Sequence, residues 1–127
     1  MNDLRTEDYL EHIVDSSGDI VSFVDGCSKE EVKEDVRTQK AVVMSLIEIG
    51  EAAIKITAND PDFVAANNEL PWGQMRGMRN RIAHGYFDID LDIVWQTATN
   101  AIPALNEQAS ELLNELREGS KPGPSLN

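Results

Sequence analysis

Apolar residues recur along most of the chain three or four positions apart, and no segment alternates apolar and polar residues as a half-buried strand would. The first stretch with this pattern covers residues 6–24 and is interrupted at residues 25–27, Asp-Gly-Cys. Ser28 is followed three residues later by Glu31, the spacing of a capping box, which predicts a second helix over residues 28–58. The first half of the chain therefore predicts two helices.

The second half of the chain continues the helical pattern. The sequence Asn-Asp-Pro at residues 59–61 ends the second helix, and a loop leads to a third helix over residues 71–85, which closes on a glycine. Asp88 or Asp90 is expected to cap a fourth helix, which Pro103 should kink because proline cannot donate a backbone hydrogen bond. The pattern predicts an all-α, up-and-down bundle of about four main helices.

Length and composition place these helices in one domain. We expect a helical domain over residues 1–117 and a disordered tail over residues 118–127, which are rich in Gly, Ser and Pro. No apolar run approaches the roughly 20 residues that span a bilayer, and the N-terminal residues do not resemble a signal peptide. The single cysteine, Cys27, excludes an intrachain disulfide. We therefore expect a cytoplasmic protein that has no membrane partner.

The distribution of charge restricts the ligands that this chain can bind. A formal net charge of -12 argues against a broad basic surface that coats nucleic acid, so any contact with RNA or DNA must be local. Residues 71–90 nevertheless hold three of the eleven basic residues, Arg76, Arg79 and Arg81, and one of the two histidines, His84. Cations beside a titratable imidazole predict a local site for a polyanion, with nucleic acid as the first candidate.

A polar ridge interrupts the otherwise apolar second helix. Glu48, Glu51 and Lys55 are spaced three and four residues apart among apolar neighbours. A carboxylate in such surroundings is costly unless it is paired, so Glu48 and Glu51 are candidate structural supports for the arginines of the third helix. The alternative is a narrow solvent-exposed stripe with an intrahelical pair between Glu51 and Lys55.

The functional candidates on the third helix do not share one face. Arg76, Asn80 and His84 follow one another four residues apart and form a ridge. Arg79 and His84, in contrast, point about 140° apart on an ideal helix. If these two residues act together, either the helix ends at His84 or a second copy of the chain completes the site.

The third helix carries a motif of known type. It reads Arg79, four residues, His84, one residue and Tyr86, with the polar Asn80 directly after the arginine. This motif resembles that of the HEPN superfamily, and specifically of its HepT-type toxins, whose partners are MntA-type nucleotidyltransferase antitoxins. The resemblance covers most of the chain, because other segments are also similar to family positions: residues 46–53 (LIEIGEAA), Pro71-Trp72 and Val94-Trp95.

The resemblance implies the toxin of a type VII-like toxin–antitoxin pair, a metal-independent endoribonuclease that cleaves tRNA or mRNA. It further implies a homodimer in which two copies of the motif meet in a cleft. His84 would then perform acid–base chemistry, Arg79 would bind the scissile phosphate, and Asn80 would orient either group. Arg76 and Arg81 could bind flanking phosphates of the RNA.

The resemblance also implies how the toxin is controlled. In the family, the residue that matches Tyr86 receives AMP from the antitoxin, which adds bulk and negative charge at the cleft. We expect no metal and no cofactor. Asp88, Asp90 and Asp92 lack the glycine of a calcium loop, and Thr99 stands where that loop requires glutamate.

Two other functions remain open from the sequence. One is a catalytically silent HEPN domain that binds nucleotide or RNA, and the other is a dimeric scaffold for a partner nucleotidyltransferase. Each site residue also has a structural alternative: His84 could stabilise the helix C-terminus, Arg79 could only pair with Glu51, and Tyr86 could only pack with Phe87.

Overall fold

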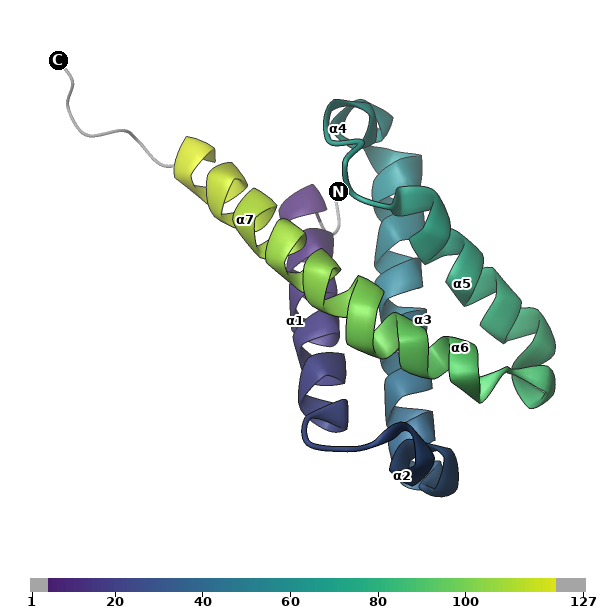
Figure 1. Ribbon diagram of the computed structural model, residues 1–127. Helices are drawn as coiled ribbons and strands as arrows, with labels where there is room; N and C mark the ends of the chain where they lie inside the picture. Colours follow the sequence, from purple (N-terminus) through teal and green to yellow (C-terminus); the bar gives the residue numbers. More distant parts are fainter. Residues whose placement is uncertain (1–4, 121–127) are drawn as a thin grey trace, which may run out of the picture.

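The computed structural model describes residues 5–120 and is an all-α bundle (Figure 1). Within these residues the chain forms helices and turns and no strand, as the sequence predicts. Four long helices build the bundle: α1 (Thr6–Val24), α3 (Val36–Asn59), α5 (Trp72–Gly85) and α7 (Ile102–Ser120). Shorter elements connect them: α2 (Lys29–Glu34), α4 (Pro61–Ala66), the 3-10 turn η1 (Tyr86–Asp88), α6 (Leu91–Gln96) and the π-helical turn η2 (Thr97–Ala101).

The central helix of the bundle is α3. It packs against α1 on one side and α5 on the other, and α7 crosses in front and packs mainly on α1 (Figure 1). The apolar positions at helical spacing are the buried ones, and among them Leu10, Ile13, Val42, Ala53 and Ile56 have no exposed surface. Burial of these side chains is the main force that holds the bundle together.

The predicted helix over residues 28–58 is wrong in one respect, because the chain breaks at Asp35. The Ser28–Glu31 capping box forms as expected and begins α2. The Asp35 carboxylate then accepts hydrogen bonds from the backbone N–H groups of Arg37 and Thr38, at 3.1 and 3.3 Å, and so caps a new helix. The Thr38 hydroxyl also donates to this carboxylate, and these bonds hold the Asp35 pKa below its usual value of 3.8.

The expected loop after residue 59 contains a further short helix. Asp60 caps α4 by accepting from the backbone N–H of Phe63, and Pro61 occupies the first helical position, where its missing N–H costs nothing. The sequence Asn-Asp-Pro therefore ends one helix and begins the next.

The fourth predicted helix is also divided. Its first part, α6, leads into η2, in which the backbone N–H of Ile102 bonds to the carbonyl of Thr97, five residues earlier. Pro103 follows directly and cannot donate to the carbonyl four residues before it. The disturbance that was predicted at the proline therefore takes the form of a π-helical turn just ahead of it. Helix α7 continues through Ser120, so residues 118–120 of the expected tail are helical. The remaining tail, residues 121–127, lies outside the described residues.

Ion pairs connect helices that are distant in the sequence. Lys29 and Lys33 contact the Asp92 carboxylate at 3.2 and 3.1 Å and join α2 to α6, and the hydrogen bonds from Lys33 and Lys29 lower the Asp92 pKa. Arg117 joins α7 to Glu7 of α1 at 3.0 Å. Among the described residues, every helix is too short or too polar to cross a membrane.

Candidate functional site

A close contact between α3 and α5 fixes the position of the candidate site. A Cβ atom added to Gly50 would lie 2.2 Å from the Cβ of Arg79 and 2.8 Å from the carbonyl oxygen of Met75. Only glycine allows the two backbones to approach so closely. On the same side of α5, the buried Met75 and Ile82 join the core. Gly50 therefore sets the position from which the Arg79 side chain extends.

The Arg79 side chain is held by two neighbours. Its Nε donates to Oε2 of Glu51 at 2.6 Å, and its Nη1 donates to Oδ1 of Asn80 at 3.2 Å. This contact confirms the predicted pairing of Glu51 with an arginine of the third helix, in place of the intrahelical pair with Lys55. Arg79 and Glu51 are 32% and 42% exposed, so water weakens their attraction and the pair orients the guanidinium more than it stabilises the fold.

Glu48 does not support an arginine, contrary to the expectation. Its Oε1 accepts a hydrogen bond from the hydroxyl of Ser16 at 3.0 Å, and its side chain is exposed. The prediction assumed apolar cover over the whole ridge, but the ridge opens into a groove of about 480 Å³ between α1 and α3. Asp15, Asp19 and Lys55 line the same groove, together with Glu51.

The other two arginines of α5 lie in different surroundings. Arg76 donates from Nη1 to the Thr57 hydroxyl at 3.0 Å and is directed toward α3. Arg81 is exposed and has no hydrogen bond or ion pair to any residue that the structure describes. The predicted group of arginines is therefore divided between two sides of α5.

His84 lies in the last turn of α5, which ends at Gly85. Its ring is exposed and makes no hydrogen bond to the described part of the chain, including the carbonyl groups at the helix end. Arg79, in contrast, is bound toward α3. The contacts within one chain therefore do not bring these two residues together.

The aromatic pair after His84 is on the surface. Tyr86 and Phe87 belong to η1, and their rings meet edge to face with centroids 5.5 Å apart. Tyr86 is 40% exposed and Phe87 is 95% exposed. The structural alternative for Tyr86, packing with Phe87 against the fourth helix, is met only in part: the two rings touch, but Phe87 is too exposed to pack against α6.

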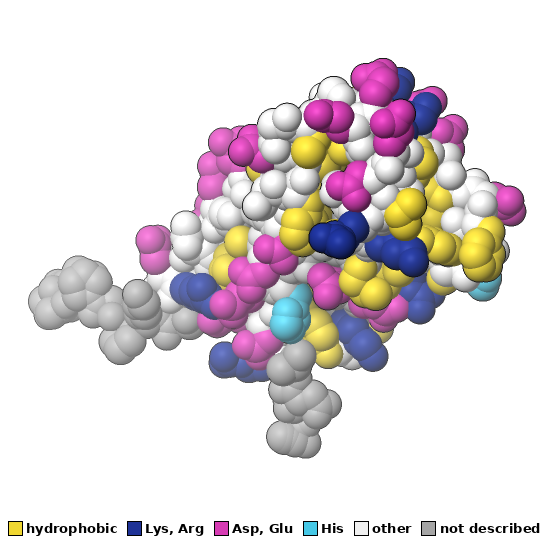
Figure 2. Space-filling model, turned by 90° about the horizontal axis from the view of Figure 1, so that it is seen from below, with side chains coloured by type: hydrophobic (Ala, Val, Ile, Leu, Met, Phe, Trp, Pro, Cys, Tyr) yellow, Lys and Arg dark blue, Asp and Glu magenta, His cyan; other side chains and the backbone are white. Residues whose placement is uncertain are grey.

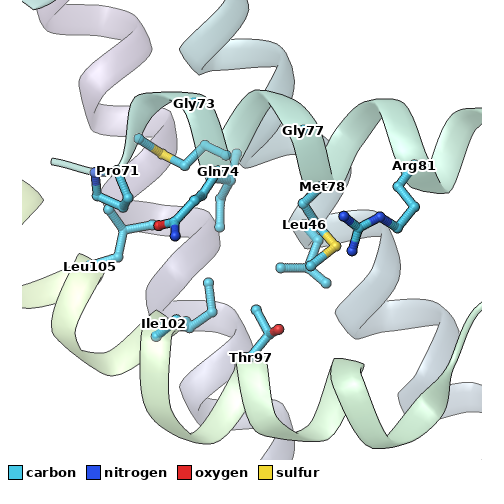
Figure 3. Close-up of a pocket in the computed structure, with 13 residues that line it drawn as sticks. Leu46, Pro71, Gly73, Gln74, Gly77, Met78, Arg81, Thr97, Ile102 and Leu105 are labelled. Carbon is cyan, nitrogen blue, oxygen red and sulfur yellow. The ribbon is translucent and has the colours of Figure 1, made fainter.

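An apolar groove of about 520 Å³ lies between α5 on one side and η2 and α7 on the other (Figure 3). Leu46 and Ile49 of α3 also line it, and Met78 and Arg81 lie together at one end. Its lining on the α5 side extends from Gly73 to Arg81, so the groove borders the helix that carries His84. The described residues contain no cluster of three His, Cys, Asp or Glu side chains able to hold a metal ion.

Sequence reasoning missed two residues that position the site. Gly50 carried a signal, since a glycine inside a long apolar helix usually marks a close packing contact. Thr57 carried none, because its role depends on how α5 lies across α3. Asn80 was expected to orient its neighbours, and its contact with Arg79 is consistent with that expectation.

Comparison with known proteins places the chain among ribonuclease-like sequences. Residues 13–112 match the family described as ribonuclease HepT-like. A protein of Caldanaerobacter subterraneus subsp. tengcongensis, whose name marks it as a candidate RNase, is 34% identical over 84% of this chain and 93% of the relative. A protein of Thermococcus cleftensis named "probable ribonuclease HepT" is 35% identical over 84% of this chain and 94% of the relative. No solved structure matches the chain significantly.

Proposed function

The chain belongs to the HepT-like ribonuclease family, and from this premise we propose that it is a toxin endoribonuclease that cleaves RNA without a metal ion. The observation that carries the proposal is the geometry of α5. Arg79 is oriented by Glu51 and Asn80, while the His84 ring in the last turn is exposed and able to meet a substrate. RNA is the proposed substrate because the family is one of ribonucleases, and these two groups can supply the proton transfer and charge stabilisation that cleavage at a 2′-hydroxyl needs.

The chemistry follows from the groups present. His84 accepts the proton of the RNA 2′-hydroxyl, whose oxygen attacks the adjacent phosphorus. The bond from phosphorus to the 5′ oxygen breaks, and that oxygen takes a proton from water. The products are a 2′,3′-cyclic phosphate and a 5′-hydroxyl. Arg79 stabilises the additional negative charge on the phosphorus centre through its planar pair of N–H donors.

The active form that we propose is a homodimer in which Arg79 of one copy acts with His84 of the other. Two observations support it. Arg79 is bound toward α3 while the exposed His84 ring makes no hydrogen bond to any described residue, so the contacts within one chain do not bring the two groups together. The second observation is the apolar groove beside α5, which reaches Arg81 at one end (Figure 3). A second copy seated there would lie beside the helix that carries the motif.

The dimer has a direct test with a matched control. Met78 is half-buried at the groove and Met44 is 56% exposed on α3, away from the groove. We expect Met78→Glu to give a folded monomer and Met44→Glu to remain a dimer, measured by light scattering and circular dichroism. A wild-type monomer, or a dimer unaffected by Met78→Glu, would contradict this placement of the second copy.

Control by AMPylation extends the proposal to Tyr86. Its hydroxyl would attack the α-phosphorus of ATP on the antitoxin, release pyrophosphate and lose its proton, which leaves AMP on the tyrosine. The 40% exposure of Tyr86 and its place two residues after His84 support this assignment. Mass spectrometry of the toxin co-expressed with a neighbouring nucleotidyltransferase should find AMP on Tyr86, and a neutralised toxin with an unmodified Tyr86 would refute it.

The ribonuclease activity itself is tested with purified protein and total RNA in the presence of EDTA. We expect cleavage by the wild type and its loss in His84→Ala, with circular dichroism unchanged. RNA that stays intact, with and without Mg²⁺, would overturn the proposed ribonuclease activity. Salt-sensitive RNA binding without cleavage would then indicate the silent binding domain, and the absence of both would indicate the scaffold.

A further inference from the structure

Phe87 is the most exposed of the large hydrophobic side chains that the structure describes. It is 95% exposed, whereas the next most exposed, Val36, is 58% exposed. Aromatic rings dominate the energetics of cores and interfaces, so a fully presented ring offers a large apolar face to a ligand. Phe87 is part of neither within this chain.

The local backbone holds Phe87 in this position. The 3-10 turn η1 follows α5 directly, and its last bond runs from the N–H of Ile89 to the carbonyl of Tyr86 at 3.3 Å. The Tyr86 ring contacts the Phe87 ring edge to face, which restricts the rotation of both. The ring therefore stands three residues after His84, on a defined turn rather than a loose loop.

The negative net charge of the protein bears on how it could bind RNA. Most proteins bind RNA through many phosphate contacts, but this chain has a net charge of -12. Figure 2 shows acidic side chains spread among the basic ones across the face that it presents. Stacking of a base on an aromatic ring does not depend on net charge, so it provides affinity that an acidic protein does not obtain from phosphates.

We infer that Phe87 is a binding residue on which an unpaired RNA base stacks, next to the phosphate that is cleaved. This inference rests on the proposed ribonuclease function and names a feature of its substrate: a single-stranded segment with a base free to leave its neighbours. His84 and Arg81 are both exposed near the end of α5, three and six residues before Phe87 in the sequence.

The test separates stacking from hydrophobic contact with a second copy. Phe87→Leu keeps an apolar side chain but removes the aromatic face, whereas Phe87→Trp keeps that face. Phe23→Leu is the matched control, because Phe23 is 39% exposed in the last turn of α1, far along the chain from the site. Each substitution is made in a His84→Ala background, and binding of a short fluorescent single-stranded RNA is followed by anisotropy.

We expect Phe87→Leu to weaken RNA binding about fivefold or more, while Phe87→Trp and Phe23→Leu stay within about twofold of the parent. A plot of the logarithm of the dissociation constant against the logarithm of salt concentration should have the same slope for Phe87→Leu as for the parent, because no phosphate contact is lost. The molecular mass in solution should not change. Unaltered binding in Phe87→Leu, or a loss that accompanies dissociation of a dimer, would overturn the inference.

Cleavage by the protein without the His84 substitution separates this inference from the proposed function. If it cleaves RNA and Phe87→Leu binds normally, the stacking role alone fails. If it never cleaves RNA yet binding depends on the aromatic ring at position 87, the proposed ribonuclease function is refuted and the stacking role stands. Absence of any RNA binding contradicts both.

Discussion

The contact at Gly50 gives a prediction whose size follows from the structure. In Gly50→Ala the new Cβ would lie 2.2 Å from the Arg79 Cβ, whereas ordinary contacts begin at 3.4 Å. Helix α5 must therefore move away from α3 by about 1.2 Å at this point, the difference between those two distances. Since the atoms that clash are a Cβ and the backbone of α5, rotation of a flexible side chain does not relieve the contact.

The expected effect on stability is smaller than the effect on activity. Overpacking costs about 1 to 3 kcal/mol, and replacing a helical glycine by alanine returns up to about 1 kcal/mol. We thus expect the free energy of unfolding to fall by about 1 to 2 kcal/mol. Displacement of a catalytic group by about 1 Å can reduce the rate about 100-fold, and the displaced group here is Arg79.

The assay compares Gly50→Ala with Gly18→Ala. Gly18 is also inside a helix, but a Cβ there would meet only Nδ2 of Asn106 at an ordinary 3.5 Å. Urea unfolding should show Gly18→Ala equal to or more stable than the wild type by up to about 1 kcal/mol, with full ribonuclease activity. If Gly50→Ala is as stable and as active as Gly18→Ala, the close contact does not position Arg79 and the reasoning is refuted.

Three further predictions concern the same framework. Glu51→Gln should reduce RNA cleavage about tenfold. The free energy of unfolding should change by less than about 1 kcal/mol, because the pair with Arg79 is partly exposed. A loss of cleavage that is fully explained by a loss of stability in urea would contradict an orienting role. Arg79→Lys should reduce cleavage nearly as much as Arg79→Ala, since an ammonium lacks the planar pair of donors, and kinetics that match the wild type would show that charge alone suffices. Asp35→Asn should melt below the wild type at neutral pH. The depressed Asp35 pKa adds stability above its usual 3.8 that is lost as the pH falls through the lower folded value, so the two melting curves should converge at low pH, and a constant gap would argue against this cap.

Much of the fold could be predicted because it depends on local patterns. The apolar spacing located all four long helices, and the Ser28–Glu31 capping box marked the start of α2. The break at Asp35 was missed, because an aspartate within a helical pattern can either remain in the helix or cap a new one. The choice between these depends on how α2 packs: its Val32 is buried and α2 contacts both α3 and α6, which is tertiary information.

The candidate site could be predicted only in part, for a related reason. The pairing of Arg79 with Glu51 followed from a polar ridge on one helix facing a basic helix. Glu48 was also expected to pair with an arginine. It lies instead in the groove between α1 and α3, where it is exposed and accepts a hydrogen bond from Ser16. One-dimensional spacing gives the face of a helix on which a residue lies, but not which neighbour covers that face.

The central claim is that Arg79 of one copy works with His84 of its partner. The most direct test mixes Arg79→Ala and His84→Ala subunits, each inactive alone, and isolates the mixed dimer with two different affinity tags. One of its two sites keeps both intact groups, so the account predicts about half of the wild-type rate of RNA cleavage. A mixed dimer as inactive as either parent would contradict it.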